Sequence, residues 1–181
     1  MVGLKKQIKS GQKIIAIYGL GNVGGPIAAA WLRKDATVIG VDISKDLSLN
    51  IKNNSSHKKE PYISETFTKG LRKQKFSLTS DGVKASMLST IKFVAVPVDI
   101  KQNKINLNAL ISATTAISKG LKKGNTVIIC PSLPPGTTEK LVKQILEKHS
   151  KLKAEKDFNL IYNPERIFEG RALQDIEENY P

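Results

Sequence analysis

Short apolar runs rich in β-branched residues alternate with segments of helical periodicity along almost the whole chain. The apolar runs are Ile14–Tyr18, Thr37–Val41, Phe76–Thr79, Ile91–Val96, Thr126–Cys130 and Phe158–Tyr162. The helical patterns cover Val23–Arg33, Tyr62–Lys73, Leu107–Leu121, Thr138–His149 and Ala172–Glu177. Apolar strands separated by helices are typical of βαβ units, in which helices cover both faces of a parallel sheet. The pattern predicts an α/β fold with a doubly wound parallel sheet.

The length of 181 residues suits one domain of this kind. We expect a basic N-terminal arm over residues 1–12, which holds three lysines and no long apolar run, and a single domain over residues 13–181. The stretch Ile51–Lys59 is rich in Asn, Ser and Lys, and it is the best candidate for a mobile loop.

Residues that mark disulfides, metal sites and membrane segments are scarce in this sequence. The sequence has one cysteine, Cys130, and two histidines, His57 and His149. This composition excludes an intramolecular disulfide and a cysteine-based zinc site, and it predicts no metal site. No run approaches the ~20 apolar residues that span a bilayer, and the N-terminus lacks the apolar region of a signal peptide. We therefore expect a cytoplasmic protein with no membrane partner.

The formal net charge of +13 makes nucleic acid one candidate partner. Only four of the 29 basic residues are arginines, and the lysines are scattered singly or in pairs without interleaved aromatic residues. Sites that stack bases combine basic and aromatic side chains, so a solvated Lys-rich surface is the favoured interpretation. A positive field would also attract an anionic dinucleotide or nucleotide-sugar. A basic nucleic-acid-binding protein is the less favoured alternative.

The segment Gly19-Leu20-Gly21-Asn22-Val23-Gly24 joins the first predicted strand to the first predicted helix. In such loops the first glycine permits a tight turn, the second lets a pyrophosphate approach, and the third lets the helix pack closely. The helix N-terminus offers N–H groups and partial positive charge to the phosphates. Asp42 ends the second predicted strand, where a carboxylate binds the adenosine ribose and repels a 2′-phosphate. We expect NAD rather than NADP; the alternative is a Rossmann-like turn that binds FAD or no ligand.

Three later predicted strands end in proline-containing loops, namely Pro97-Val98-Asp99, Cys130–Gly136 and Asn163–Arg166. The carboxyl ends of parallel strands meet at the edge of the sheet where ligands bind. We therefore expect these loops to lie on the same edge as Gly21 and Asp42.

Glu165 and Glu169 are four residues apart, a spacing that brings two side chains near each other on one helical turn. A carboxylate beside a nicotinamide can act as a base or hold a water molecule. Alternatively, each is an acid at a helix N-terminus that the macrodipole stabilises. The spacing alone favours neither interpretation.

These segments together resemble the amino-terminal domain of the UDP-glucose/GDP-mannose dehydrogenase family, from about residue 13 to residue 181. The segments that carry the resemblance are Gly19–Gly24, Gly40–Ile43, Val94–Pro97, Pro134–Glu139 and Asn163–Ile167. Within the family, the chain is most similar to the branch that oxidises UDP-N-acetylmannosamine. The resemblance implies a Rossmann-like domain of a homodimeric enzyme that oxidises the C6 alcohol of a UDP-hexose to a uronate. That reaction takes two NAD-dependent steps, through a thiohemiacetal and a thioester on a cysteine.

The resemblance also assigns roles to individual residues. Ser132 would hold a water beside the reacting carbon, and Glu165 would act in thioester hydrolysis, which makes these two the catalytic residues. Glu169 would lie near the nicotinamide and the substrate, and Val98 would contribute to the cofactor pocket. The complete set of expected cofactor-binding residues is Gly19, Leu20, Gly21, Asn22, Val23, Gly24, Asp42, Val98, Ser132 and Glu169. Three positions depart from the family pattern. Ser132 and Val98 stand where the family usually has Thr, and Leu47 stands where many members have a cation on the adenosine side.

The family's catalytic cysteine and lysine lie downstream of the segment that this sequence resembles, and Cys130 does not match that nucleophile. We therefore expect the 181 residues to bind NAD without completing the oxidation. The substrate domain, the C-terminal domain and one further strand of the sheet would follow Pro181. The alternative is a stand-alone NAD-binding module with a regulatory role.

Overall fold

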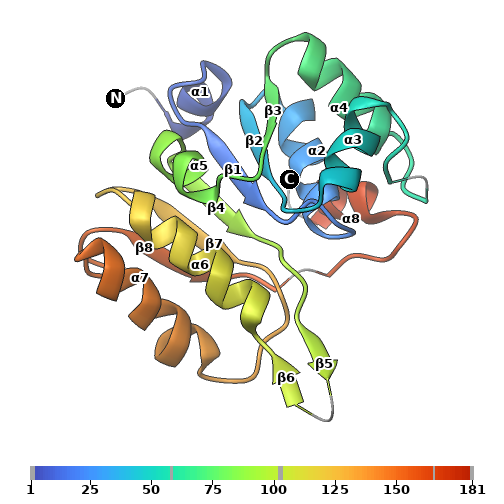
Figure 1. Ribbon diagram of the computed structural model, residues 1–181. Coiled ribbons are helices and arrows are strands. Elements are labelled where there is room, and N and C mark those ends of the chain that lie inside the picture. Colours follow the sequence, from blue (N-terminus) through green and yellow to red (C-terminus); the bar gives the residue numbers. More distant parts are fainter. Residues whose placement is uncertain (1–2, 58, 102–103, 165, 180–181) are drawn as a thin grey trace.

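The fold is a parallel sheet covered by helices on both faces (Figure 1). The computed structural model describes residues 3–57, 59–101, 104–164 and 166–179, and within them six strands form one sheet in the order β3-β2-β1-β4-β7-β8. These strands are β1 (Ile15–Tyr18), β2 (Val38–Val41), β3 (Phe76–Thr79), β4 (Ile91–Val94), β7 (Thr126–Ile129) and β8 (Asn159–Tyr162). Every neighbouring pair is parallel. The predicted doubly wound sheet is confirmed, with strand ends that differ by one or two residues from the apolar runs.

The central strand β1 shows how the two faces are built. All four of its residues are buried, and Ile15 and Ile17 contribute to one core cluster whereas Ala16 and Tyr18 contribute to the other. Successive side chains of a strand point to opposite faces, so a strand covered on both sides is apolar at every position. This requirement explains why the central strands read as continuous apolar runs.

Helices cover both faces of the sheet (Figure 1). The helices on one face pack into the first core cluster, and those on the other face pack into the second. The first face carries α2 (Gly24–Arg33), α3 (Lys45–Lys52), α4 (Ile63–Arg72) and α8 (Ala172–Asn179). The opposite face carries α5 (Gly82–Leu88), α6 (Asn108–Gly120) and α7 (Lys143–Ser150), the last preceded by a π-helical turn over Thr138–Val142. The five helical patterns that the sequence indicates all lie within or around these helices.

Several observed elements were not expected from the sequence. The expected arm contains a short helix, α1 (Leu4–Lys9), whose Ile8 is buried in the first core cluster. Helix α3 is mostly polar and begins at Ser44, whose hydroxyl accepts the N–H of Leu47. Asp81 caps α5 in the same way. A hairpin of β5 (Asp99–Lys101) and β6 (Lys104–Asn106) follows β4. Short capped helices bury few residues, so their apolar periodicity is weak.

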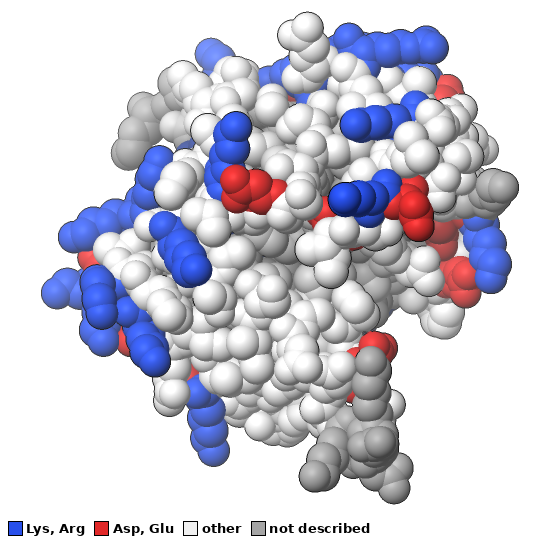
Figure 2. Space-filling view, in the orientation of Figure 1, with Lys and Arg blue, Asp and Glu red and all other residues white. Residues whose placement is uncertain are grey.

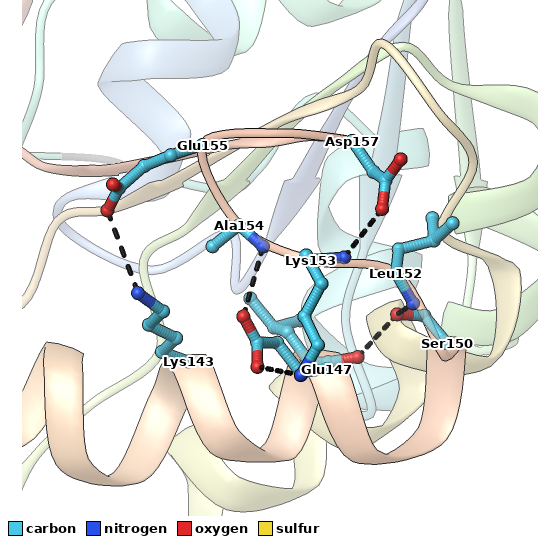
Figure 3. A network of polar contacts seen from close by, with 9 residues as sticks. Lys143, Glu147, Ser150, Leu152, Lys153, Ala154, Glu155 and Asp157 are labelled. Atoms are coloured by element: carbon cyan, nitrogen blue, oxygen red, sulfur yellow. Dashed lines mark hydrogen bonds and ion pairs between the residues drawn. The ribbon is translucent and has the colours of Figure 1, made fainter.

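A polar network shapes the loop between α7 and the edge strand β8 (Figure 3). Glu147 accepts hydrogen bonds from Lys153 Nζ at 3.0 Å and from the backbone N–H of Ala154 at 3.1 Å. Asp157 accepts the backbone N–H of Lys153 at 2.9 Å. These bonds tie the loop to the end of α7 and so set where β8 begins.

After β8 the chain returns to the first face of the sheet, where α8 packs against α2 (Figure 1). Leu173 is buried in the first core cluster, and Arg33 pairs with Glu177 at 3.0 Å. The segment between β8 and α8 therefore crosses from the edge strand back toward the middle of the sheet.

Candidate dinucleotide-binding site

A cavity of about 820 Å³ lies at the carboxyl ends of β1, β2 and β4. Its walls come from the loop after β1, the end of β2, the loops after β4 and β7, and one side of α6. The structure brings together in this cavity the expected residues Gly19, Gly21, Asn22, Val23, Asp42, Val98 and Ser132. The carboxyl edge of the sheet is where open α/β folds bind their ligands.

The three glycines of the loop between β1 and α2 meet different surroundings. Gly19 has a left-handed φ of 87°, and a Cβ there would lie 2.7 Å from the carbonyl oxygen of Ala95. A Cβ on Gly24 would lie 1.8 Å from the carbonyl oxygen of Gly19, because α2 packs directly against the loop. Nothing lies within 4 Å of the position of a Cβ on Gly21. The loop is thus tight at both ends and open at Gly21, where a ligand can approach the backbone.

The same loop presents hydrogen-bond donors to the cavity. Within the described part of the chain, the backbone N–H groups of Gly21, Asn22 and Val23 donate to no other residue. They precede the first turn of α2, where the helix macrodipole places partial positive charge. Open space, N–H donors and a helix N-terminus are together the features that a phosphate group needs for binding.

Asp42 is joined to the loop by its carboxylate. One carboxylate oxygen accepts the backbone N–H of Leu20 at 2.8 Å, and the other accepts that of Ser44 at 2.8 Å. Each carboxylate oxygen can accept a second hydrogen bond, so Asp42 retains acceptor capacity for ligand hydroxyls on the cavity side. The exposed side chain of Ile43 and the side chain of Leu47 line the cavity beside it.

One wall of the cavity was missed by the sequence reasoning. Ala109, Ser112, Ala113 and Ala116 of α6 all line it. Their spacing of three and four residues puts these small side chains on one face of the helix. The sequence does show these small residues at helical spacing. Whether they line a cavity or pack against another element depends on what this face of α6 is turned toward, which the spacing does not indicate.

Tyr18 lies at the base of the cavity and connects β1 to α5. Its hydroxyl donates to the carbonyl oxygen of Gly82 at 2.6 Å, and burial raises the pKa of Tyr18 well above its usual value. A Cβ on Gly82 would lie 3.1 Å from the Tyr18 ring and 3.1 Å from Ala116 Cβ. The absence of a side chain at Gly82 therefore lets α5 and α6 close around this ring.

Three expected cofactor-binding residues lie outside the cavity lining. Leu20 is fully buried in the core, and Gly24 packs against Gly19. Glu169 is exposed and forms an ion pair with Lys59 at 3.1 Å. The expected catalytic residue Glu165 lies outside the described residues.

The described residues contain neither a membrane-spanning helix nor a metal-binding cluster. None of their helices has the length and apolar character that a bilayer span needs, and they bring no three Cys, His, Asp or Glu side chains together in a way that could hold a metal ion. On the face shown in Figure 2, the Lys and Arg side chains stand at several separate places over the upper part and along the left edge, and they do not form one patch.

Comparison with known proteins gives consistent matches over nearly the whole chain. The sequence model of the NAD binding domain of the UDP-glucose/GDP-mannose dehydrogenase family matches residues 13–180. The UDP-N-acetyl-D-mannosamine dehydrogenase of Campylobacter jejuni is 32% identical over 177 residues, covering 91% of this chain and 42% of that protein. The GDP-mannose 6-dehydrogenase of Pseudomonas syringae pv. tomato is 32% identical, covering 90% of this chain and 38% of that protein.

Solved structures agree with the sequence matches. The GDP-mannose dehydrogenase of Pseudomonas aeruginosa, solved as a ternary complex, superposes with a TM-score of 0.83 at 30% identity over 89% of this chain and 38% of that one. The UDP-D-ManNAc dehydrogenase of Pyrococcus horikoshii gives a TM-score of 0.84 at 29% identity over 90% of this chain and 38% of that one. The chain spans about two fifths of the length of these relatives.

Proposed function

The chain belongs to the UDP-glucose/GDP-mannose dehydrogenase family as an NAD-binding domain, and we propose that it serves as the cofactor-binding part of an enzyme that oxidises the C6 alcohol of a UDP-sugar to a carboxylate. The observation that carries this proposal is the combination of Gly21, its neighbouring N–H groups and Asp42 in one cavity. The residues present fit an NAD molecule, because they supply a phosphate site and a ribose acceptor on adjacent strands.

The sheet order supports one direction for the proposed dinucleotide. Asp42 follows β2, the glycine loop follows β1, and Val98 and Ser132 follow β4 and β7 on the other side. Three strand spacings of about 4.8 Å separate β2 from β7, roughly 14 Å, which is within the reach of an extended dinucleotide. The adenosine end is assigned to Asp42, the pyrophosphate to Gly21, and the nicotinamide end to Val98 and Ser132.

When bound, NAD supplies the hydride acceptor for the oxidation. At the nicotinamide end we assign Ser132 to hold a water molecule through its hydroxyl and Glu165 to thioester hydrolysis. Glu169 is assigned a place near the nicotinamide and the substrate. These assignments rest on the family resemblance and on the place of Ser132 in the cavity lining. Cys130 directly follows β7 and is almost completely buried, as part of the first core cluster.

The 181 residues are proposed to bind NAD without oxidising the sugar. The relatives are more than twice as long as this chain. The family resemblance implies that the cysteine nucleophile of the covalent intermediates lies beyond this domain. The UDP-sugar and a second copy of the subunit are accordingly proposed as partners of the complete enzyme.

The decisive experiment is a fluorescence titration of the purified chain with NADH. Saturable binding is expected for the wild type, and Gly21→Val should abolish it, because the new side chain fills the open space beside the phosphate donors. Gly3→Val is the matched control, since a Cβ there also meets nothing within 4 Å and Gly3 lies outside the cavity lining.

Two results would contradict the proposal. Unchanged NADH binding in Gly21→Val would refute the assigned phosphate site. Formation of NADH from NAD and a UDP-hexose by the 181-residue chain alone would refute the proposal that oxidation of the sugar needs residues beyond this chain.

A further inference from the structure

The chain between α3 and α4 touches the glycine loop through His57. Its Nε2 lies 2.7 Å from the carbonyl oxygen of Leu20 and 3.4 Å from that of Gly21. A carbonyl oxygen can only accept, so Nε2 carries the hydrogen and donates it. Nδ1 is buried and has no hydrogen-bond partner among the described residues. Within that part of the chain, the ring makes its polar contacts with the glycine loop alone.

This hydrogen bond acts on a peptide group that faces the proposed phosphate. The carbonyl of Leu20 and the N–H of Gly21 belong to one planar trans peptide, in which they point in opposite directions. Because His57 holds the carbonyl on one side, the N–H of Gly21 is directed to the other. That N–H has no acceptor among the described residues, and Gly21 lines the cavity.

Gly25 independently supports the position of the His57 imidazole beside α2. A Cβ on Gly25 would lie only 2.3 Å from His57 Nε2. Glycine is less favourable than alanine inside a helix, and Gly25 is the second residue of α2. The missing side chain is therefore explained by the space that His57 occupies.

The segment that presents His57 is anchored at the helix that follows it. The imidazole stands edge-on to Phe67 of α4, with ring centroids 5.5 Å apart, and Phe67 is fully buried. Ser64 of α4 donates its hydroxyl hydrogen to the carbonyl oxygen of Ser56. Glu60 donates its backbone N–H to the carbonyl oxygen of His57 at 2.8 Å. These contacts hold the ring in a defined position before any ligand binds.

From these contacts we infer that His57 is a positioning residue of the dinucleotide site, whose Nε2–H holds the Leu20–Gly21 peptide so that the Gly21 N–H points at the pyrophosphate. The inference rests on the proposed binding of NAD at the glycine loop and adds to it a residue from a different crossover of the fold. His57 contacts the loop and not the ligand, so its effect should depend on whether a ligand carries phosphates at this position.

The first test compares ligands with and without a pyrophosphate. NADH, ADP-ribose and adenosine are titrated, the last two by displacement of NADH, against the wild type and His57→Leu. Loss of one hydrogen bond should weaken NADH and ADP-ribose binding by about fivefold to tenfold. Adenosine binding should stay unchanged, because adenosine does not reach Gly21. A purely structural defect would instead weaken all three ligands alike.

A conservative variant separates the donor from the ring. His57→Gln keeps an N–H donor near the position of Nε2 and should restore most of the affinity for NADH. Melting temperatures establish that each variant is folded at the titration temperature. Wild-type affinity for NADH in His57→Leu, or an equal loss for adenosine, would overturn the inference.

The second test is a double-mutant cycle between Gly25 and His57. In the wild type, Gly25→Ala should displace the ring, lower the melting temperature and weaken NADH binding severalfold. In a His57→Ala background the same substitution should raise the melting temperature and cause no further loss of binding, because alanine is the better helix former. Additive effects of the two substitutions would overturn the assigned contact.

The two proposals fail in different ways. Absence of saturable NADH binding by the wild type would overturn the proposed function and this role of His57 with it. NADH binding that depends on Gly21 but not on His57 would leave the proposed function standing and overturn the positioning role alone.

Discussion

The carboxylate of Asp42 accepts the backbone N–H of Leu20 at 2.8 Å, although 22 residues separate them in the chain. The acid at the end of β2 and the glycine loop after β1 are therefore one unit. Leu20 contributes to the site through its backbone, with its N–H held by Asp42 and its carbonyl by His57, while its side chain is buried in the core.

Asp42 is predicted to select NADH over NADPH. The wild type should bind NADH at least about tenfold more tightly, because a carboxylate beside a 2′-phosphate costs affinity through like-charge repulsion. Asp42→Asn keeps a side-chain oxygen that can accept the Leu20 N–H. This variant should reduce the preference for NADH over NADPH, mainly because NADPH binds more tightly once the negative charge is removed. Titrations with both dinucleotides at low ionic strength measure the ratio. Equal affinities in the wild type would contradict this assignment.

Lys92 is predicted to make stability rise with pH. It is fully buried in β4, and its ammonium donates to the carbonyl oxygen of Ser89 at 2.6 Å and to the side chain of Asn125. Burial, with a contribution from the charge of Lys122, lowers the pKa of Lys92 from 10.5 to about 7. Between these pH values the unfolded chain binds more protons than the folded one, so the free energy of unfolding increases with pH.

The increase should amount to roughly 1–2 kcal/mol between pH 7.5 and pH 9. Urea denaturation at several pH values measures it in the wild type and in Lys92→Met, which should lack it. Lys5→Met, a substitution of an exposed lysine, should keep it. A pH-independent difference between wild type and Lys92→Met would argue against burial as the cause.

Glu60 is predicted to anchor α8. Its buried carboxylate accepts the backbone N–H groups of Gly170 at 2.6 Å and Ala172 at 3.1 Å, at the N-terminus of that helix. Glu60→Ala should lower the free energy of unfolding by about 1–3 kcal/mol, because the buried N–H of Ala172 and the partly buried N–H of Gly170 lose their acceptor. Glu60→Gln, which keeps one acceptor oxygen, should cost less.

The exposed Glu65 provides a control for the loss of a negative charge. Among the described residues it pairs with Lys69 alone, on the surface of α4, and Glu65→Gln should leave the urea midpoint nearly unchanged. If Glu60→Ala were equally silent, the apolar contacts of α8 with α2 and the Arg33–Glu177 ion pair would be enough to hold this helix.

The loop between α7 and β8 is predicted to be sensitive to acid. Hydrogen bonding from Lys153, and then from the Ala154 N–H, lowers the pKa of Glu147 below its usual 4.5 (Figure 3). The stabilisation is therefore fully present above about pH 4.5 and is lost as the pH falls through the lowered value. Glu147→Gln should reduce the decrease in melting temperature between pH 5 and pH 3. An unchanged acid response in this variant would assign the acid sensitivity to other carboxylates.

Local patterns were sufficient for the sheet, most helices and the phosphate loop. An apolar strand such as Ile15–Tyr18, or glycines spaced as in Gly19–Gly24, is recognisable because its physical requirement is met within a few consecutive residues. The short capped helices α3 and α5 and the β5–β6 hairpin escaped prediction, since each buries too few side chains to leave a periodic pattern.

The sequence by itself determined the parallel sheet, the glycine loop and the carboxylate at the end of β2, because these depend on strand burial and backbone conformation near each residue. Only the tertiary structure decided that His57 reaches the carbonyl of Leu20 across 37 residues and that Glu60 reaches the N–H of Gly170 across 110. It likewise decided that the small face of α6 lines the cavity. Such contacts arise from the packing of remote segments against a shared core, and no local pattern of residues encodes which segments will meet.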